Sequence, residues 1–177
     1  MKKLLALLMF GSVALTSLQA CAQDDDKSKR PSPPAKVTQT ISSGATVTID
    51  YSAPSVKGRK IGTDVEPKQA QVWRAGANEA TVFEVNKNVT VEGKPLPAGK
   101  YAFFTLDNGD GSWTLIFNKT WKTWGAYDYE KNKGEDALKV NVKPGKGAFA
   151  EKLAYKIDKS GKVSLLWGDL DVAFNVK

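Results

Sequence analysis

The sequence contains no histidine among its 177 residues, and its one cysteine, Cys21, lies near the N-terminus. Without histidine the chain lacks the commonest general base near neutral pH and the commonest metal ligand. A Ser-His-Asp or Cys-His catalyst is therefore excluded, and a single cysteine cannot form a disulfide within the chain. The fold must be stabilised by packing, and we expect no metal and no cofactor.

Phosphate-binding loops and dinucleotide-binding fingerprints are also missing from the sequence. The segment Asp107–Gly111 is similar in composition to a calcium loop, but it lacks the spacing and the distal glutamate of an EF-hand. We therefore interpret it as a hairpin turn. Because no recognised catalytic motif is present, the sequence favours a protein that is not an enzyme.

Residues 1–20 have the composition of a secretory signal peptide. Lys2 and Lys3 precede an apolar run from Leu4 to Leu18, which is shorter than the ~20 residues that a membrane-spanning helix requires. Removing this segment leaves enough residues for one domain with a core and a formal net charge near +5. We expect an exported protein, with acidic glycans, lipid headgroups or other envelope polyanions as partners rather than nucleic acid.

Two cleavage sites are compatible with the signal. Cleavage before Cys21 would follow the lipobox Leu18–Cys21 and make Cys21 the lipidated first residue of an outer-membrane lipoprotein. Cleavage after Ala22 would instead release a soluble periplasmic or secreted protein. The segment Gln23–Asp26 is similar to the surface-export signal of Bacteroidota lipoproteins, and the alternative is a solvated acidic linker. An acyl chain on Cys21 would tether the domain to a membrane without spanning it.

Period-two alternation predicts β-strands in one domain over residues 37–177, after a charged, proline-rich tether over residues 21–36. Lys100–Asp107 and Ser112–Asn118 are predicted to form a hairpin, and apolar residues on both faces of these strands indicate the interior of a sandwich. No segment has a helical stripe. The predicted fold is an all-β, antiparallel, jelly-roll-like sandwich of about ten strands, with one turn at Gly168-Asp169.

Two long connections, Ser52–Gln71 and Lys119–Ala137, interrupt the strands. Connections of more than ~12–15 residues are often functional. The first contains Lys57 and Arg59 on either side of a glycine, where backbone N–H groups and cations can approach one anion. The alternative is a solvated basic loop.

Arg74, Asn78 and Glu79 follow this first connection. Arginine offers a planar fork for carboxylate or phosphate, asparagine can bind a hydroxyl, and glutamate could act as a base. The alternative is structural, with Arg74 paired to Glu79 and Asn78 capping a turn.

The second connection carries Trp124, Tyr127 and Asp128. Exposed aromatic side chains beside a carboxylate suit sugar rings, which present C–H faces and hydroxyl groups. The alternative is that this loop folds down and buries its aromatic side chains in a satellite cluster.

The run Val72–Thr81, together with Leu96–Tyr101 and Trp124–Asp128, resembles DUF2911, a family of secreted proteins common in the Bacteroidota. The resemblance covers nearly the whole mature chain and implies an envelope β domain with no established activity. Ala53 stands where relatives usually carry arginine. If that arginine serves a ligand, the resemblance implies weaker binding by this member.

The leading hypothesis is a noncatalytic binding module for a glycan or another anionic envelope ligand. One alternative is a carboxylate-dependent enzyme acting on a sugar, which needs two carboxylates ~5–9.5 Å apart. Another is a structural or protein-interaction subunit of an envelope complex, which would present a broad apolar patch.

Overall fold

The computed structural model describes residues 26–177; the predicted signal peptide and Cys21 lie outside the described residues. None of the helices within this range is long and apolar enough to cross a membrane. The elements in chain order are η1 (Lys27–Lys29), β1 (Pro34–Thr40), β2 (Thr46–Ser52), β3 (Val72–Trp73), β4 (Thr81–Val85), β5 (Val89–Val91), β6 (Lys94–Leu96), β7 (Gly99–Asp107), β8 (Trp113–Asn118), α1 (Tyr129–Asn132), η2 (Lys133–Glu135), β9 (Asp136–Val142), β10 (Gly145–Ile157) and β11 (Lys162–Asn175).

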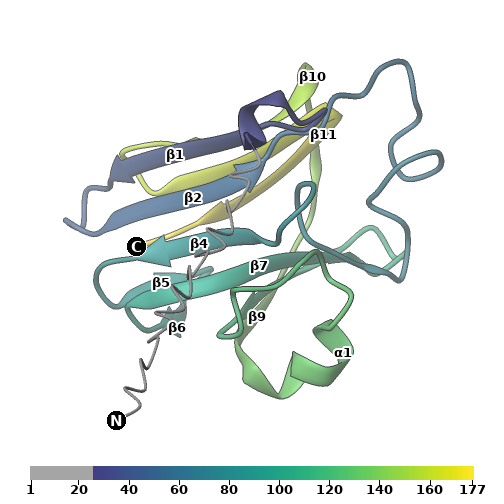
Figure 1. The fold of residues 1–177 in the computed structure, drawn as a ribbon. Coiled ribbons are helices and arrows are strands. Elements are labelled where there is room, and N and C mark those ends of the chain that lie inside the picture. Colours follow the sequence, from purple (N-terminus) through teal and green to yellow (C-terminus); the bar gives the residue numbers. More distant parts are fainter. Residues whose placement is uncertain (1–25) are drawn as a thin grey trace, which may run out of the picture.

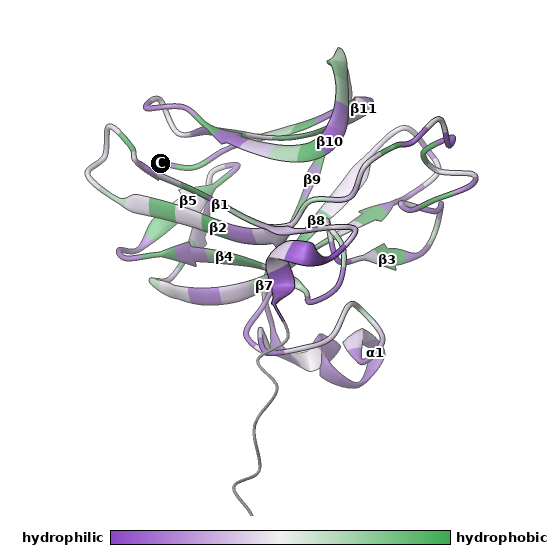
Figure 2. Cartoon of the chain, turned by 45° about the horizontal axis from the view of Figure 1, so that its top comes forward, coloured by the Kyte–Doolittle hydropathy of each residue, from purple (hydrophilic) through white to green (hydrophobic). Residues whose placement is uncertain are grey.

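These strands form two layers (Figures 1 and 2). One layer is a seven-stranded sheet in the order β1-β2-β4-β7-β8-β9, with β3 also paired to β7. The long β10–β11 hairpin forms the other layer, and β5–β6 is a short separate hairpin. Every pairing between these strands is antiparallel. The prediction of an all-β antiparallel sandwich is therefore confirmed, with eleven strands instead of about ten.

Aromatic side chains dominate the core between the layers. Phe83, Phe103 and Phe117 come from three strands of the large sheet and meet Phe174 of β11. The ring centroids of Phe83 and Phe117 lie 5.0 Å apart in an edge-on arrangement, the geometry that aromatic quadrupoles favour. Each of these rings is at most 1% exposed, so truncation of any one to alanine would cost about 3–5 kcal/mol.

The opposite face of β7 and β8 is also covered, as the apolar residues on both faces predicted. Ala102, Phe104 and Ile116 form a second buried cluster with Tyr129 of α1. The Tyr129 hydroxyl donates to Asp136 Oδ2 at 2.8 Å, which fastens the segment between β8 and β9 onto the sheet. Burial of this second face explains why neither strand shows the polar alternation of a half-exposed strand.

The predicted turn at Gly168-Asp169 is wrong, because β11 runs continuously through both residues. Lys146 pairs with Leu170, and Ala150 pairs with Gly168. Between these two pairs β10 advances four residues while β11 advances two, so β10 bulges and the hairpin bends. Gly168 has a φ of 58° and supplies the bend without ending the strand. Pro34, the first residue of β1, lies within the segment predicted as a tether.

Candidate functional site

The connection between β2 and β3 is an ordered wall rather than an open loop. The backbone N–H of Val56 donates to the carbonyl of Glu151, and the N–H of Lys57 donates to the Glu151 side chain. Within the connection, the N–H of Lys60 donates to Asp64 Oδ2 at 2.8 Å. These bonds fix the segment beside β10, and a concave site lies on each side of it.

The first site, which we call the cleft, lies between this wall and the segment after β3. It has a volume of about 420 Å³, within the range of small-molecule sites. Three residues predicted from two separate stretches of sequence line it together: Arg59, Arg74 and Asn78. Lys68 adds a third cation, and Asp64 and Glu66 add two carboxylates.

Carbonyl groups hold both arginines of the cleft in place. Arg59 donates from Nη2 to Ser55 O at 2.6 Å and from Nε to Val56 O at 3.0 Å. Arg74 donates from Nη1 to Asn78 O at 2.8 Å, and its Cζ lies 5.4 Å from the ring centroid of Tyr127. Within residues 26–177 neither guanidinium is within ion-pair distance of a carboxylate. Each therefore keeps an unneutralised charge in a fixed position.

The inner wall of the cleft is a stacked indole pair, Trp73 and Trp167, with ring centroids 5.8 Å apart and planes inclined by 19°. Both rings are 2% exposed. Trp73 Nε1 donates to Gly76 O at 3.1 Å, whereas Trp167 Nε1 is buried without a hydrogen-bond partner in the part of the chain that the structure describes. An unpaired buried donor costs about 1–3 kcal/mol, and such a group requires a functional or structural explanation.

Glu79 does not line the cleft, and it forms ion pairs with the N-terminal segment. Lys27 Nζ lies 3.0 Å from Glu79 Oε1, and Arg30 Nη1 lies 3.1 Å from the same oxygen. Partial burial raises the pKa of Glu79, but the hydrogen bonds from Lys27 and Arg30 outweigh burial and lower the pKa to about 2. The predicted alternative, a pair between Arg74 and Glu79, is wrong, and Asn78 Nδ2 donates instead to Ser32 O at 2.9 Å.

Two aromatic residues of the second connection remain on the surface. Trp124 is 53% exposed and Tyr127 is 74% exposed, while Tyr129 is buried against Phe104. Trp124 lines a shallow groove of about 330 Å³ with Glu79, Ala80, Val82 and Trp121. The guanidinium carbon of Arg30 lies 5.9 Å from the Trp124 ring centroid. Tyr129 is therefore buried in a satellite cluster, as the alternative predicted, whereas Trp124 and Tyr127 remain exposed and can contact a ligand.

The predicted site residues thus fall into separate places. Arg59, Arg74 and Asn78 line the cleft, Tyr127 touches Arg74 at its edge, and Glu79 and Trp124 line the groove. Lys57 is exposed and lines neither. Asp128 forms a surface pair with Lys131 at 3.0 Å. Sequence reasoning missed Trp167, which the alternation of β11 marked only as a core residue.

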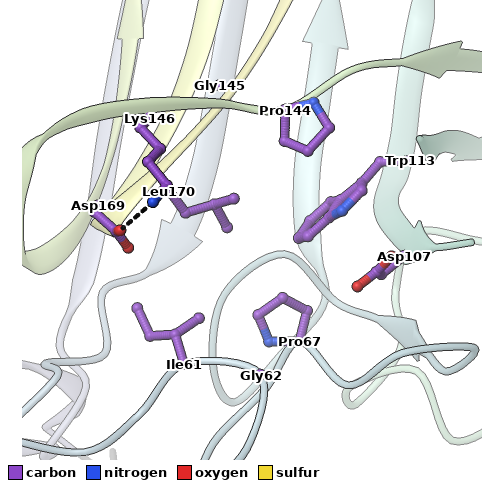
Figure 3. A pocket seen from close by; sticks show the side chains of 10 residues that line it. All are labelled: Ile61, Gly62, Pro67, Asp107, Trp113, Pro144, Gly145, Lys146, Asp169 and Leu170. Carbon is purple, nitrogen blue, oxygen red and sulfur yellow. Dashed lines mark ion pairs between the residues drawn. The ribbon is translucent and has the colours of Figure 1, made fainter. Parts of the chain in front are cut away.

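Sequence reasoning also missed a second concave site, the end pocket, on the other side of the wall (Figure 3). It has a volume of about 390 Å³ and lies between the wall, β8 and the start of the β10–β11 hairpin. Trp113, Ile61 and Leu170 are among its apolar walls, and Asp107 is among its polar residues. The lining residues come from segments far apart in the sequence, so no local sequence pattern predicts this pocket.

Comparison with known proteins gives a family assignment without an activity. A family model described as "Protein of unknown function (DUF2911)" matches residues 32–176. No curated protein and no solved structure matches the chain.

Proposed function

The chain belongs to the DUF2911 family, and for this member we propose a noncatalytic binding module of the cell envelope that recognises an anionic ligand, such as the carboxylate or phosphate of a glycan, in the cleft. The observation that carries the proposal is a surplus of fixed donors. Among the described residues, Arg59 and Arg74 are not within ion-pair distance of a carboxylate, and Trp167 Nε1 has no acceptor.

The chemistry of these donors favours an anion. A guanidinium presents several N–H groups in a plane and binds carboxylate or phosphate oxygens in pairs. The Arg74 fork is held by Asn78 O and by the Tyr127 ring, so little side-chain entropy is lost when a ligand binds. The stacked indole rings of Trp73 and Trp167 form a rigid inner wall behind these donors.

A second candidate function rests on Asp64 and Glu66, which line the same cleft. Two carboxylates in one cleft are the minimum for glycosidase-like acid and base catalysis. Both, however, accept backbone N–H groups of their own loop: Asp64 from Lys60 and Glu66 from Lys68. This favours a structural role for them, and binding without turnover remains the leading proposal.

The test is a thermal-shift screen of the purified mature protein against uronic acids, phosphorylated sugars and neutral sugars. A ligand at 100 times its Kd adds about 2.7 kcal/mol of stability, which at about 2–4 °C per kcal/mol gives a visible shift. Each hit is then incubated with the protein and analysed for cleavage products, because turnover would favour the enzymatic alternative.

Arg74→Ala is the informative variant, and Lys36→Ala is its matched control. Lys36 is an exposed cation that pairs with Asp50 on the outer face of the sheet at 3.0 Å and lines no part of the cleft. Loss of one charge-assisted bond should weaken binding by about tenfold or more in Arg74→Ala alone. An equal loss of affinity in both variants would mean that only the net charge of the protein matters. Unchanged affinity in both variants would disprove the assignment of the cleft.

A further inference from the structure

The end pocket combines apolar walls with ionic groups on opposite sides. Trp113 and Leu170 face each other across it, and Ile61 stands below them (Figure 3). The carboxylate of Asp107 lies on one side, and Lys146 lies on the other (Figure 3). The pocket therefore offers a hydrogen-bond acceptor and a donor separated by an apolar space.

Both ionic groups retain hydrogen-bonding capacity. Asp107 Oδ1 accepts the N–H of Gly109 at 2.9 Å, and a carboxylate has further lone pairs for other donors. Lys146 Nζ lies 4.0 Å from Asp169, and these side chains are 89% and 68% exposed. An ion pair so long and so exposed contributes little, so Lys146 can turn to a ligand at small cost.

The walls of the pocket are fixed before any ligand arrives. The N–H of Gly62 donates to Val65 O at 2.9 Å, and the N–H of Ala70 donates to the backbone carbonyl of Asp107 at 2.9 Å. Gly62 has a φ of 84°, which glycine adopts without strain. A preformed site loses less free energy on binding than one that must be ordered.

We propose that the end pocket binds the acetamido group of an N-acetylated amino sugar. In a trans amide the N–H and the C=O point in opposite directions, as the acceptor Asp107 and the donor Lys146 require. The methyl group would occupy the apolar space beside Ile61, Leu170 and Trp113. Hydroxyl groups of the ring would meet the exposed ionic residues at the rim.

An amino sugar fits this arrangement better than a peptide. The acetamido group ends in a methyl, whereas a peptide continues on both sides of its amide and would need space beyond the apolar walls. The local charge points the same way, because Asp107 and Asp169 outnumber Lys146 and disfavour an anion. The end pocket thus differs in polarity from the cleft, and its occupancy does not depend on the function proposed there.

Saturation-transfer NMR on the purified mature protein tests this directly, with N-acetylglucosamine, glucosamine and glucose as separate probes. We expect saturation of the acetyl methyl protons of N-acetylglucosamine to exceed that of its ring protons, and little transfer to the other two sugars. Equal transfer to glucose, or no transfer to N-acetylglucosamine, would overturn the proposal. Stronger transfer to trialanine, whose amides carry no acetyl group, than to the sugar would assign the pocket to a peptide instead and also overturn it.

Two variants locate the signal in the end pocket. Asp107→Asn keeps an oxygen for Gly109 but loses a charged acceptor, and we expect Kd for N-acetylglucosamine to rise about tenfold. Ile61→Trp fills the pocket and should abolish the methyl signal. Asp50→Asn, the same exchange at a partly exposed position of β2 that lines neither site, should leave Kd unchanged. Unchanged Kd in Asp107→Asn together with a persisting methyl signal in Ile61→Trp would refute the assignment.

Discussion

The stacked pair Trp73 and Trp167 allows a test of the unpaired donor Trp167 Nε1, because Trp73 serves as the control. Both rings are 2% exposed and lie against each other, so replacing either by phenylalanine removes the same atoms from the same environment. The two substitutions share the cost of a smaller buried ring. They differ in the hydrogen bond, because Trp73 Nε1 has Gly76 O as its acceptor and Trp167 Nε1 has none within residues 26–177.

The difference can be estimated from the two N–H groups. Trp73→Phe leaves Gly76 O without its donor, which costs about 1–3 kcal/mol, whereas Trp167→Phe removes an unsatisfied group and recovers a similar amount. Trp73→Phe should therefore be the more destabilising variant by at least about 2 kcal/mol. For a domain of this size, the two melting temperatures should differ by roughly 4–8 °C.

Urea unfolding of both variants, followed by circular dichroism, measures this difference. Equal m-values would show that the comparison concerns stability and not the unfolded state. Equal free energies of unfolding would refute the reasoning, because they would mean that Trp167 Nε1 is satisfied in solution.

Three further predictions follow from single contacts. Glu79 has a folded pKa of about 2 against an ordinary value of 4.5, so its contribution to the stability of the fold is complete above pH 4.5 and is lost as the pH falls towards 2. Because the Glu79 side chain is 39% exposed, we expect this contribution to be only about 1 kcal/mol. Acid unfolding of Glu79→Gln should not show this loss of stability. Gly168→Ala should destabilise by about 1 kcal/mol or more in urea unfolding, since φ is 58° and the new Cβ would lie 2.6 Å from Ile61 Cδ1; wild-type stability would contradict this. Tyr129→Phe loses the 2.8 Å bond to Asp136 and should cost about 0.5–1.5 kcal/mol, with faster amide exchange in α1 as the measurement.

The sequence was sufficient to predict the strands because their signal is local. Val47 and Ile49 alternate with threonine in β2, and both are fully buried in the core. The hairpin of β7 and β8 was predicted from its turn residues, and the register pairs Asp107 with Trp113. Gly168 did not distinguish a turn from a bent strand, because it has the positive φ of a turn residue but lies within the continuous strand β11. Only the extra residues in the facing strand β10 distinguish these cases.

The cleft was predictable only in its polar part. Arg59, Arg74 and Asn78 stood out because charged and amide groups within or just after a long connection have no packing role to explain them. Trp167 did not stand out, since its position in β11 is that of any core residue. Its stacking on Trp73 joins the two layers, and no local pattern specifies which buried aromatic residues meet across a sandwich. The N-terminal partners of Glu79 were missed for a related reason, because Lys27 and Arg30 lie about fifty positions away in the sequence.

The balance of donors and acceptors separates binding from catalysis more sharply than the residue types do. A general base needs a carboxylate that can take up a proton near neutral pH. Glu79 is held ionised by Lys27 and Arg30, and Asp64 and Glu66 already accept N–H groups of the wall. Arg59 and Arg74 donate to backbone carbonyl groups and pair with no carboxylate among the described residues. A cleft whose guanidinium charges are fixed by carbonyl groups and not neutralised by a carboxylate is suited to hold an anion.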